Sequence, residues 1–304
     1  MDTLRLAYPV STMEHQLLLP AGTVLSQEIL EELISSPAAG SNQTYSLLGH
    51  GTVKHDMLRL IRKPPYDSIL SDREQTDEIL SIMETIRLAL PVLETLNHFK
   101  TYDYHTYCHN LMVFALSTLI ARDLIPDYTD WIRGVSIGPT HDIGKICVPP
   151  HILKKQTPLT RTERSILDHH AAAGYVLLAY YHSDLNNLAA VVARDHHERR
   201  DGSGKPRGIH LMDFMVEIIV VCDVYDALLS PRPYRPASYD NRTALEEITR
   251  MAEMKKIGWE VVKALVARNR KNKPRHDETE VSDEKRGTPP PVNCHGFTAE
   301  DDES

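Results

Sequence analysis

Residues 141–145 read His-Asp-Ile-Gly-Lys, two side chains of metal-ligand type followed closely by a glycine. Adjacent residues of a helix point about 100° apart. His141 and Asp142 can therefore reach one site only where a helix ends over it. Gly144 favours such an end, because glycine is the preferred residue just beyond a helix C-terminus. The stretch predicts a helix that ends at a functional site.

Other histidines fit the same layout. Residues 196–206 read His-His-Glu-Arg-Arg-Asp-Gly-Ser-Gly-Lys-Pro, so His196 and His197 stand at a helix end before a glycine-rich loop. His105 and His109 are four residues apart, and residues with that spacing share one helix face. We expect these side chains to meet at the ends of several helices.

The number and type of these side chains indicate metal chemistry. The chain has 304 residues and 16 histidines, and 11 of the histidines lie between His98 and His210. Imidazole and carboxylate without thiolate suit iron, manganese, zinc or nickel and disfavour a structural zinc site. The candidate ligands exceed the roughly four to six that one ion takes. Two ions fit better, and such a pair can hold both oxygens of an in-line phosphoryl displacement. The candidates are His105, His109, His141, Asp142, His169, His170, His196, His197 and Asp223.

The composition excludes several other classes of protein. With 34 Lys+Arg against 42 Asp+Glu, the net charge of -8 argues against a binder of DNA or RNA polymers. The four cysteines show no Cys-x-x-Cys pair, so a zinc ribbon or a disulfide framework is not expected. No signal peptide and no membrane-spanning run is apparent. We expect a cytoplasmic protein with no membrane partner.

The spacing of apolar residues predicts a mainly helical fold. Apolar residues from Ile79 to Leu93 recur at steps of three or four, and Pro91 should kink or divide that helix. No alternating strand pattern follows residue 70. Thr160 and Glu163 form a capping box at one helix start. Further helices are predicted over 104–123, 128–143, 161–180, 184–197, 211–229, 241–254 and 258–270.

Both ends of the chain differ from this helical part. Residues 1–70 predict a small mixed α/β unit, with two short strands within 17–25 and a helix over 27–34 capped by Ser26. Residues 271–304 hold nine carboxylates and five Lys/Arg with almost no aliphatic side chains, so they predict a disordered acidic tail. The main all-α domain should span residues 71–270.

Five motifs together resemble the HD-GYP family, bacterial HD-superfamily phosphodiesterases that linearise cyclic di-GMP. In order they are residues 141–145, 170–174, 196–206, 223–228 and 230–235. The likeness covers roughly residues 100–265. It implies an HD-type helical bundle as the main domain, preceded by the small N-terminal unit. In the family such a preceding region is often regulatory or dimerising, so the analogy allows a homodimer.

The resemblance also implies a role for each matching residue. It implies two divalent metal ions, iron or manganese, held by His109, His141, Asp142, His170, His196, His197 and Asp223. Asp142 would bridge the two ions, and His105 matches an extra ligand for a third metal in some members. Asp142 and Lys145 would be catalytic, with Lys145 facing the scissile phosphate. Substrate-binding residues would be Lys145, Lys205, Arg232 and Arg235.

The chain departs from the family pattern near the substrate. The motif reads Gly204-Lys205-Pro206, with lysine in place of the tyrosine that gives the family its name. Lys205 could contact a phosphate or could be solvated. Glu217 stands where members usually have arginine. All seven ligand positions are nevertheless filled, as expected of an active enzyme.

The sequence thus predicts a bacterial signalling hydrolase, a metal-dependent phosphoric diester hydrolase. A metal-bridging hydroxide would attack a cyclic dinucleotide, and cyclic di-GMP would give linear pGpG or GMP. A first alternative is an HD phosphohydrolase that cleaves another nucleotide, such as cyclic GMP-AMP. A second is a receptor that binds a cyclic dinucleotide without cleaving it.

Overall fold

Two buried helices form the centre of the molecule. The structure is a computed structural model and describes residues 4–36, 39–40, 43–135, 137–211, 213–231, 237–290 and 298–299. Helix α6 (Tyr104–Leu124) is buried almost continuously from Thr106 to Ala121, and α12 (Phe214–Leu229) packs along it. Both are apolar on most sides, which is typical of a helix surrounded by others.

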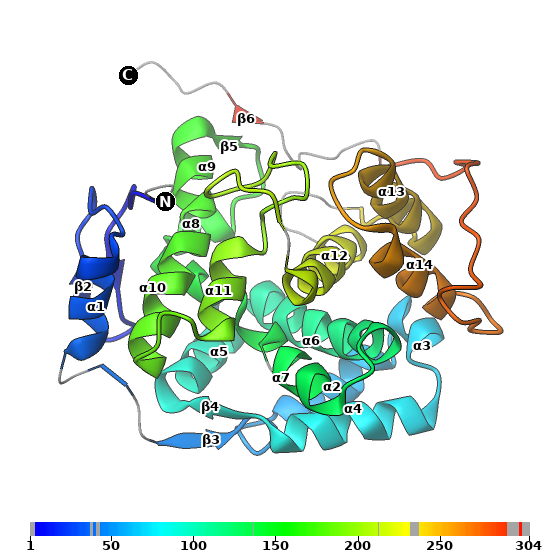
Figure 1. The fold of residues 1–304 in the computed structure, drawn as a ribbon, viewed down its shortest axis with the longest axis horizontal. Helices are drawn as coiled ribbons and strands as arrows, with labels where there is room; N and C mark the ends of the chain where they lie inside the picture. Colours follow the sequence, from blue (N-terminus) through cyan, green and yellow to red (C-terminus); the bar gives the residue numbers. More distant parts are fainter. Residues whose placement is uncertain are drawn as a thin grey trace.

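The remaining helices of the main domain surround this pair (Figure 1). In Figure 1, α10 and α11 lie on one side of α6, and α13 and α14 lie on the other. The surrounding helices are α4 (Arg73–Thr85), α5 (Leu90–Tyr102), α7 (Tyr128–Val135), α8 (Pro150–Leu153), α9 (Arg161–Asp168), α10 (His170–His182), α11 (Leu188–Asp195), α13 (Asn241–Glu253) and α14 (Trp259–Arg268). None of the described helices is long and apolar enough to cross a membrane.

The N-terminal residues form a small mixed unit beside these helices. It contains β1 (Val10–Ser11), β2 (Leu17–Leu19), α1 (Gln27–Ser35), β3 (Thr44–Ser46), α2 (Val53–Ile61) and α3 (Tyr66–Ile69). Strands β1 and β2 pair antiparallel, and α1 packs on α10. The predicted second strand within 17–25 is reduced to one bridge between Val24 and Arg5. The predicted fold class, a mainly helical domain with a small mixed N-terminal part, is confirmed.

The N-terminal residues and the helical residues share one continuous hydrophobic core. Leu6 and Met57 belong to the same buried cluster as Phe114 of α6 and Leu265 of α14. The predicted division at residue 70 stays a prediction. The shared core nevertheless means that N-terminal side chains can reach the centre of the molecule.

Several predicted helices are confirmed, two are shorter than expected and one is divided. The helix predicted over 184–197 is α11, which spans only Leu188–Asp195. The predicted helix over 128–143 ends at Val135 and is followed by the 3-10 turns η1 (Gly138–Thr140) and η2 (Ile143–Cys147). Pro139 has no amide hydrogen for a continuing helix, which explains the break. The predicted helix over 161–180 is divided at His169 into α9 and α10.

The predicted start and break signals are present. Ser26 caps α1 through a hydrogen bond from the Ile29 amide. Thr160 and Glu163 form the capping box of α9. Pro91 lies in the first turn of α5. The predicted helix is divided, but before the proline, because α4 ends at Thr85 and residues 87–89 form a strand.

Three short strands lie after residue 70, where none was expected. Strand β4 (Arg87–Ala89) pairs with β3, and β5 (Leu159–Thr160) pairs with β6 (Thr298–Ala299). Each is only two or three residues long. Strands this short cannot be recognised from the sequence, because an alternating pattern of apolar and polar residues needs about four residues or more.

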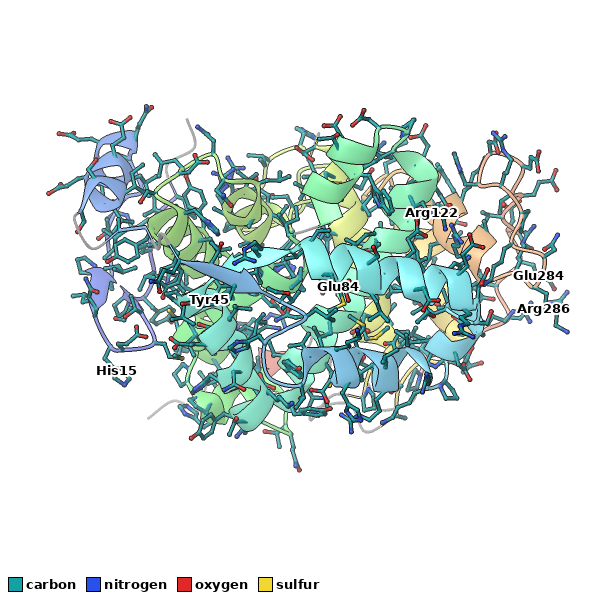
Figure 2. The ribbon with its side chains drawn as sticks, turned by 90° about the horizontal axis from the view of Figure 1, so that it is seen from below. His15, Tyr45, Glu84, Arg122, Glu284 and Arg286 are labelled. Atoms are coloured by element: carbon teal, nitrogen blue, oxygen red, sulfur yellow. The ribbon has the colours of Figure 1, made fainter. Side chains whose placement is uncertain are left out.

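An ion pair joins α4 to α6. Arg122 of α6, which Figure 2 labels, pairs with Glu78 of α4 at 2.7 Å. Figure 2 also shows His15 and Arg286 near opposite ends of the molecule.

Residues 271–290 contain no helix or strand, and their Arg286 and Gly287 amides donate to the Glu246 carboxylate. The disorder of residues 271–304 stays a prediction.

The three described cysteines, Cys108, Cys147 and Cys222, are free thiols, and Cys294 lies outside the described residues.

The turn that carries His141 and Asp142 packs unusually close to α10. A Cβ on Gly144 would lie 2.0 Å from the carbonyl oxygen of His170 and 2.4 Å from the amide nitrogen of Gly174. Both of these contacts are with backbone atoms, which cannot move aside cheaply. Only glycine permits this approach, and the approach brings residues 141–142 beside His170.

Replacing Gly144 by alanine should therefore force η2 away from α10. We expect Gly144→Ala to lower the free energy of unfolding by about 1–3 kcal/mol, the usual cost of overpacking a core. The matched control is Gly49→Ala, whose Cβ would be 3.6 Å from Ser46 Cβ, an ordinary contact. It should change stability by less than about 0.5 kcal/mol. Urea denaturation measures both, and equal stabilities would contradict the packing argument.

Candidate metal centre

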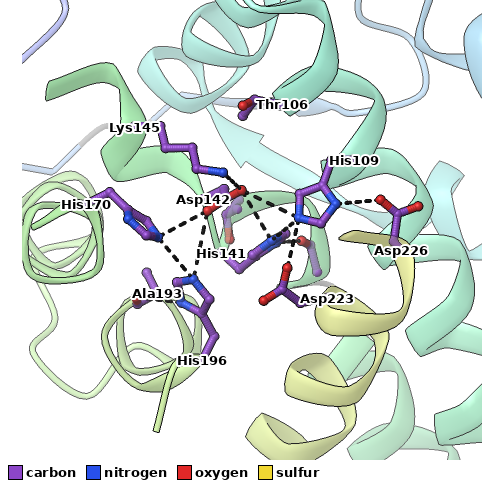
Figure 3. Close-up of polar contacts among 12 residues, drawn as sticks. Thr106, His109, His141, Asp142, Lys145, His170, Ala193, His196, Asp223 and Asp226 are labelled. Atoms are coloured by element: carbon purple, nitrogen blue, oxygen red, sulfur yellow. Dashed lines mark hydrogen bonds and ion pairs between the residues drawn. The ribbon is translucent and has the colours of Figure 1, made fainter. Parts of the chain in front are cut away.

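Five segments of the chain bring seven predicted ligands to one place. Figure 3 labels all of them except His197. His109 lies on α6, and His141 and Asp142 lie at the turn between η1 and η2. His170 begins α10, and His196 and His197 follow directly after α11. Asp223 is in the middle of α12. The helix-end layout predicted for residues 196–197 is thus observed, while residues 141–142 stand between two 3-10 turns.

The ligand atoms form two groups. In the first, His170 Nε2 lies 3.3 Å from His196 Nε2 and 3.1 Å from His197 Nε2. In the second, His109 Nε2 lies 3.3 Å from His141 Nε2 and 3.0 Å from Asp223 Oδ1. Within each group, all three ligand atoms lie within 4.8 Å of one another. We call these the His170 group and the His109 group.

Asp142 stands between the two groups. Its Oδ1 is 3.3 Å from His170 Nε2, and its Oδ2 is 3.6 Å from His109 Nε2 and 3.7 Å from His141 Nε2. Each carboxylate oxygen therefore faces a different group. A carboxylate can join two cations in this way, one through each oxygen.

The hydrogen bonds of the rings leave the facing nitrogen atoms as acceptors. The Nδ1 atoms of His141, His170 and His196 lie 2.8, 2.5 and 2.9 Å from the carbonyl oxygens of Gly138, Leu167 and Ala193. A carbonyl only accepts, so each Nδ1 carries the hydrogen and each Nε2 of a neutral ring is left with a lone pair. Metal-binding histidines have this pattern.

These lone pairs point at one another and at carboxylate oxygens. Carboxylate oxygens likewise accept hydrogen bonds and cannot donate them. A cation between them satisfies every one of these atoms at once. The donor set therefore fits a pair of metal ions, one in each group. The two clusters are consistent with a binuclear metal site.

Burial keeps the ligands in the form that binds metal. It lowers the pKa of His196 to about 3, with the neighbouring His141 and His170 adding to the shift. Burial likewise lowers the pKa values of His141 and His197. Burial alone would raise the pKa of Asp142, but Lys145 and the nearby histidines hold it well below its usual range. Near neutral pH the three histidines are therefore uncharged imidazoles, and Asp142 is a carboxylate.

Asp226 is a site residue that the sequence analysis missed. It is fully buried, and its Oδ2 accepts a hydrogen bond of 2.6 Å from His109 Nδ1. This fixes the ring of His109 with Nε2 toward Asp223 and His141. The available signal was the spacing, because residues three apart on a helix share a face and Asp226 follows Asp223 by three.

Glu198 is a second missed residue. Its side chain is fully buried and accepts hydrogen bonds of 2.7 Å from the Arg207 amide and 3.1 Å from the Ile209 amide. These contacts hold the loop that follows His197 and carries Lys205. A glutamate beside two ligands reads as a further ligand or a surface residue, so its role as a loop anchor is not visible in the sequence.

A cavity of about 440 Å³ opens onto the two groups. This volume is typical of a site for a small organic ligand. Its walls include His109, Asp142, His170, His197 and Asp223. Five cationic side chains of the described residues also line it: Lys145, Arg164, Arg199, Lys205 and Lys256. Of these five, only Lys145 and Lys205 were predicted.

The other predicted residues have varied positions. His105 is exposed, one turn before His109, and belongs to neither group of described ligands. His169 is buried, and its ring meets Tyr8 edge-on at 5.6 Å between centroids. Arg232 and Arg235 lie outside the described residues.

The two residues that depart from the family pattern, Lys205 and Glu217, each form an ion pair. Lys205 pairs with Asp168 of α9 at the cavity wall, and its side chain is 61% exposed. Glu217 is buried and forms two hydrogen bonds of 2.6 Å with Arg200. It also accepts the Gly258 amide at 2.7 Å. Glu217 therefore ties the loop after His197 to the start of α14.

Comparison with known proteins agrees with this geometry. The HD domain family model matches residues 92–261, more than half of the chain. A cyclic di-GMP phosphodiesterase of Pseudomonas aeruginosa is 32% identical over 77% of this chain and 54% of its own length. A cyclic di-GMP phosphodiesterase of Thermotoga maritima is 38% identical over 53% of this chain and 44% of its own length.

A third relative has another substrate in its name. A 3′3′-cGAMP-specific phosphodiesterase of Vibrio cholerae is 38% identical over 44% of this chain and 29% of its own length. The chain thus spans about half of the length of these relatives, or less. It belongs to the HD domain family and is related to the HD-GYP cyclic di-GMP phosphodiesterases.

Proposed function

We propose that this protein is a metal-dependent phosphodiesterase that hydrolyses a cyclic dinucleotide, and that cyclic di-GMP is its substrate. The observation that carries the proposal is the pair of ligand groups on either side of Asp142, at a cavity lined by five cations. The relatives that share the HD domain are named for cyclic di-GMP or cyclic GMP-AMP. Linear pGpG or GMP would be the product.

The His170 group and the His109 group would each hold one divalent cation, iron or manganese, with Asp142 between them. Imidazole and carboxylate ligands suit both metals. When bound, such a pair lowers the pKa of water to supply a nucleophile and offsets negative charge on the phosphoryl oxygens. His105 would hold a third metal only if its exposed ring turned toward the cavity.

The chain's own residues would bind and orient the phosphodiester. Lys145 Nζ lies 2.5 Å from Asp142 Oδ2 and faces the cavity, so its charge would reach a phosphate placed over the two groups. Lys205 would contact a phosphate at the cavity mouth after exchanging its bond to Asp168. Arg232 and Arg235 would add bidentate contacts, for which the planar guanidinium is suited.

Cleavage of cyclic GMP-AMP is the second candidate, and Lys205 is the observation that favours it. The residue replaces the family tyrosine and lines the cavity. A long cation there changes what the wall presents to a nucleobase. A receptor without hydrolysis is the remaining candidate, and measurement of turnover separates it from the other two.

Loss of Asp142 should abolish turnover. The protein purified with manganese or iron should contain two metal ions per chain and convert cyclic di-GMP to linear product. Asp142→Asn should lower the rate by at least about a hundredfold and reduce the metal content, because the carboxylate faces both groups. Elemental analysis and chromatography of the products provide the measurements.

The matched control is Asp56→Asn, which alters a buried aspartate that pairs with Lys100 at 2.7 Å outside the metal centre. It should keep both metal ions. Wild-type protein that holds two ions and leaves cyclic di-GMP intact would reject this substrate. Turnover of cyclic GMP-AMP by the same sample would then favour the second candidate.

Lys205 should affect substrate binding and not the metal centre. We expect Lys205→Ala to raise KM for the cyclic dinucleotide about fivefold, with kcat and metal content unchanged, because one charged contact is worth about 1 kcal/mol at an exposed site. Lys54→Ala removes a comparably exposed lysine, paired with Glu84 at 3.5 Å and absent from the cavity wall. It should leave KM unchanged. An unchanged KM in Lys205→Ala would show that the lysine does not contact substrate.

A further inference from the structure

The carboxylate that orients His109 is itself held by a residue from the N-terminal unit. The Tyr66 hydroxyl of α3 donates a hydrogen bond to Asp226 Oδ1. On the other carboxylate oxygen, Ser230 Oγ donates at 3.1 Å and His109 Nδ1 at 2.6 Å. Tyr66, Asp226 and His109 are thus joined in a continuous chain of hydrogen bonds that ends at His109 Nδ1, and the other nitrogen of this ring, Nε2, is the predicted metal ligand.

Each member of this chain is buried. Asp226 has no exposed surface, His109 is 3% exposed and Tyr66 is 7% exposed. A carboxylate without water must take its hydrogen bonds from the protein, and removal of one donor leaves a charged oxygen without its partner. Burial and the charge of Asp226 raise the pKa of Tyr66 well above its usual value, so the phenol keeps its hydrogen and remains a donor.

The hydrogen bond to Asp226 determines which ring nitrogen of His109 carries the lone pair and where that nitrogen points. Asp226 accepts from Nδ1, so the lone pair of His109 is on Nε2, which faces Asp223 Oδ1 at 3.0 Å. If Asp226 rotated or shifted, the imidazole would lose the contact that sets both its tautomer and its orientation. The Tyr66 hydroxyl limits that rotation because it binds the oxygen that His109 does not use.

Tyr66 also lies outside the part of the chain that matches the HD domain model. That match covers residues 92–261, whereas α3 spans Tyr66–Ile69. Asp226 and His109 both lie within the match. The N-terminal unit therefore supplies a contact to the metal centre that the HD segment lacks when taken alone.

We propose that Tyr66 is a positioning residue that sets the metal affinity of the His109 group through Asp226. The inference rests on the proposed metal site and goes beyond it, because it assigns the N-terminal unit a part, through Asp226 and His109, in holding one of the two ions. A change that moved α3 would then loosen one ion and leave the His170 group untouched.

The test is a titration of metal-free protein with Mn²⁺, which needs no substrate. Wild type should bind two ions. Tyr66→Phe removes only the hydroxyl and should keep one ion at wild-type affinity while the other binds about tenfold more weakly, as found when partners of metal-bound histidines are removed. The matched control is Tyr107→Phe, which also removes a buried tyrosine bond to an aspartate, 3.0 Å to Asp56. It should bind both ions as wild type does.

A double-mutant cycle distinguishes positioning from general destabilisation. If Tyr66 acts through Asp226, then Tyr66→Phe should weaken binding no further in an Asp226→Asn background. Melting temperatures of Tyr66→Phe and Tyr107→Phe report whether the two losses of stability are comparable. Unchanged binding of both ions by Tyr66→Phe, or an additive loss in the double variant, would overturn the inference. Wild type that binds no ion would instead reject the proposed metal site and the inference with it.

Discussion

The arrangement of the site depends on one electrostatic requirement. Buried acceptor atoms face one another there, and they need a positively charged partner between them. The Nε2 atoms of His109 and His141 are 3.3 Å apart, as are those of His170 and His196, and Asp142 directs one oxygen at each pair. The opposite ring nitrogens of these histidines already donate to carbonyl or carboxylate oxygens. Bound cations would satisfy these atoms. Burial lowers the pKa values of His141 and His196 and keeps those two imidazoles neutral.

The fold holds these ligand atoms in place because the backbone segments that carry them are rigid. Helices α6 and α12 are buried along most of their length, so His109 and Asp223 have little freedom to move. The contact between Gly144 and Gly174 holds the turn with His141 and Asp142 against α10. Asp226, Glu198 and Glu217 then fix the ring of His109 and the loop that carries Lys205. Ligands far apart in the sequence thus keep one geometry.

Features with a local sequence signal could be predicted, and features set by distant partners could not. Residue type and helical spacing gave the pool of candidate histidines and aspartates, and the resemblance to the HD-GYP family selected seven of them. The caps at Ser26 and Thr160 followed from their own neighbours in sequence. The 3-10 turns around Pro139 were missed because the apolar pattern of residues 128–143 continues across the proline. Asp226 and Tyr66 are 160 residues apart, and nothing near either residue indicates the other as its partner. The roles of Arg232 and Arg235 remain predictions.

Anomalous X-ray diffraction from crystals of the manganese-loaded protein tests the central claim most directly. Two ions should appear in each chain, one within coordinating distance of His170, His196 and His197 and the other of His109, His141 and Asp223, with Asp142 touching both. A single ion, or ions bound away from Asp142, would contradict the binuclear centre.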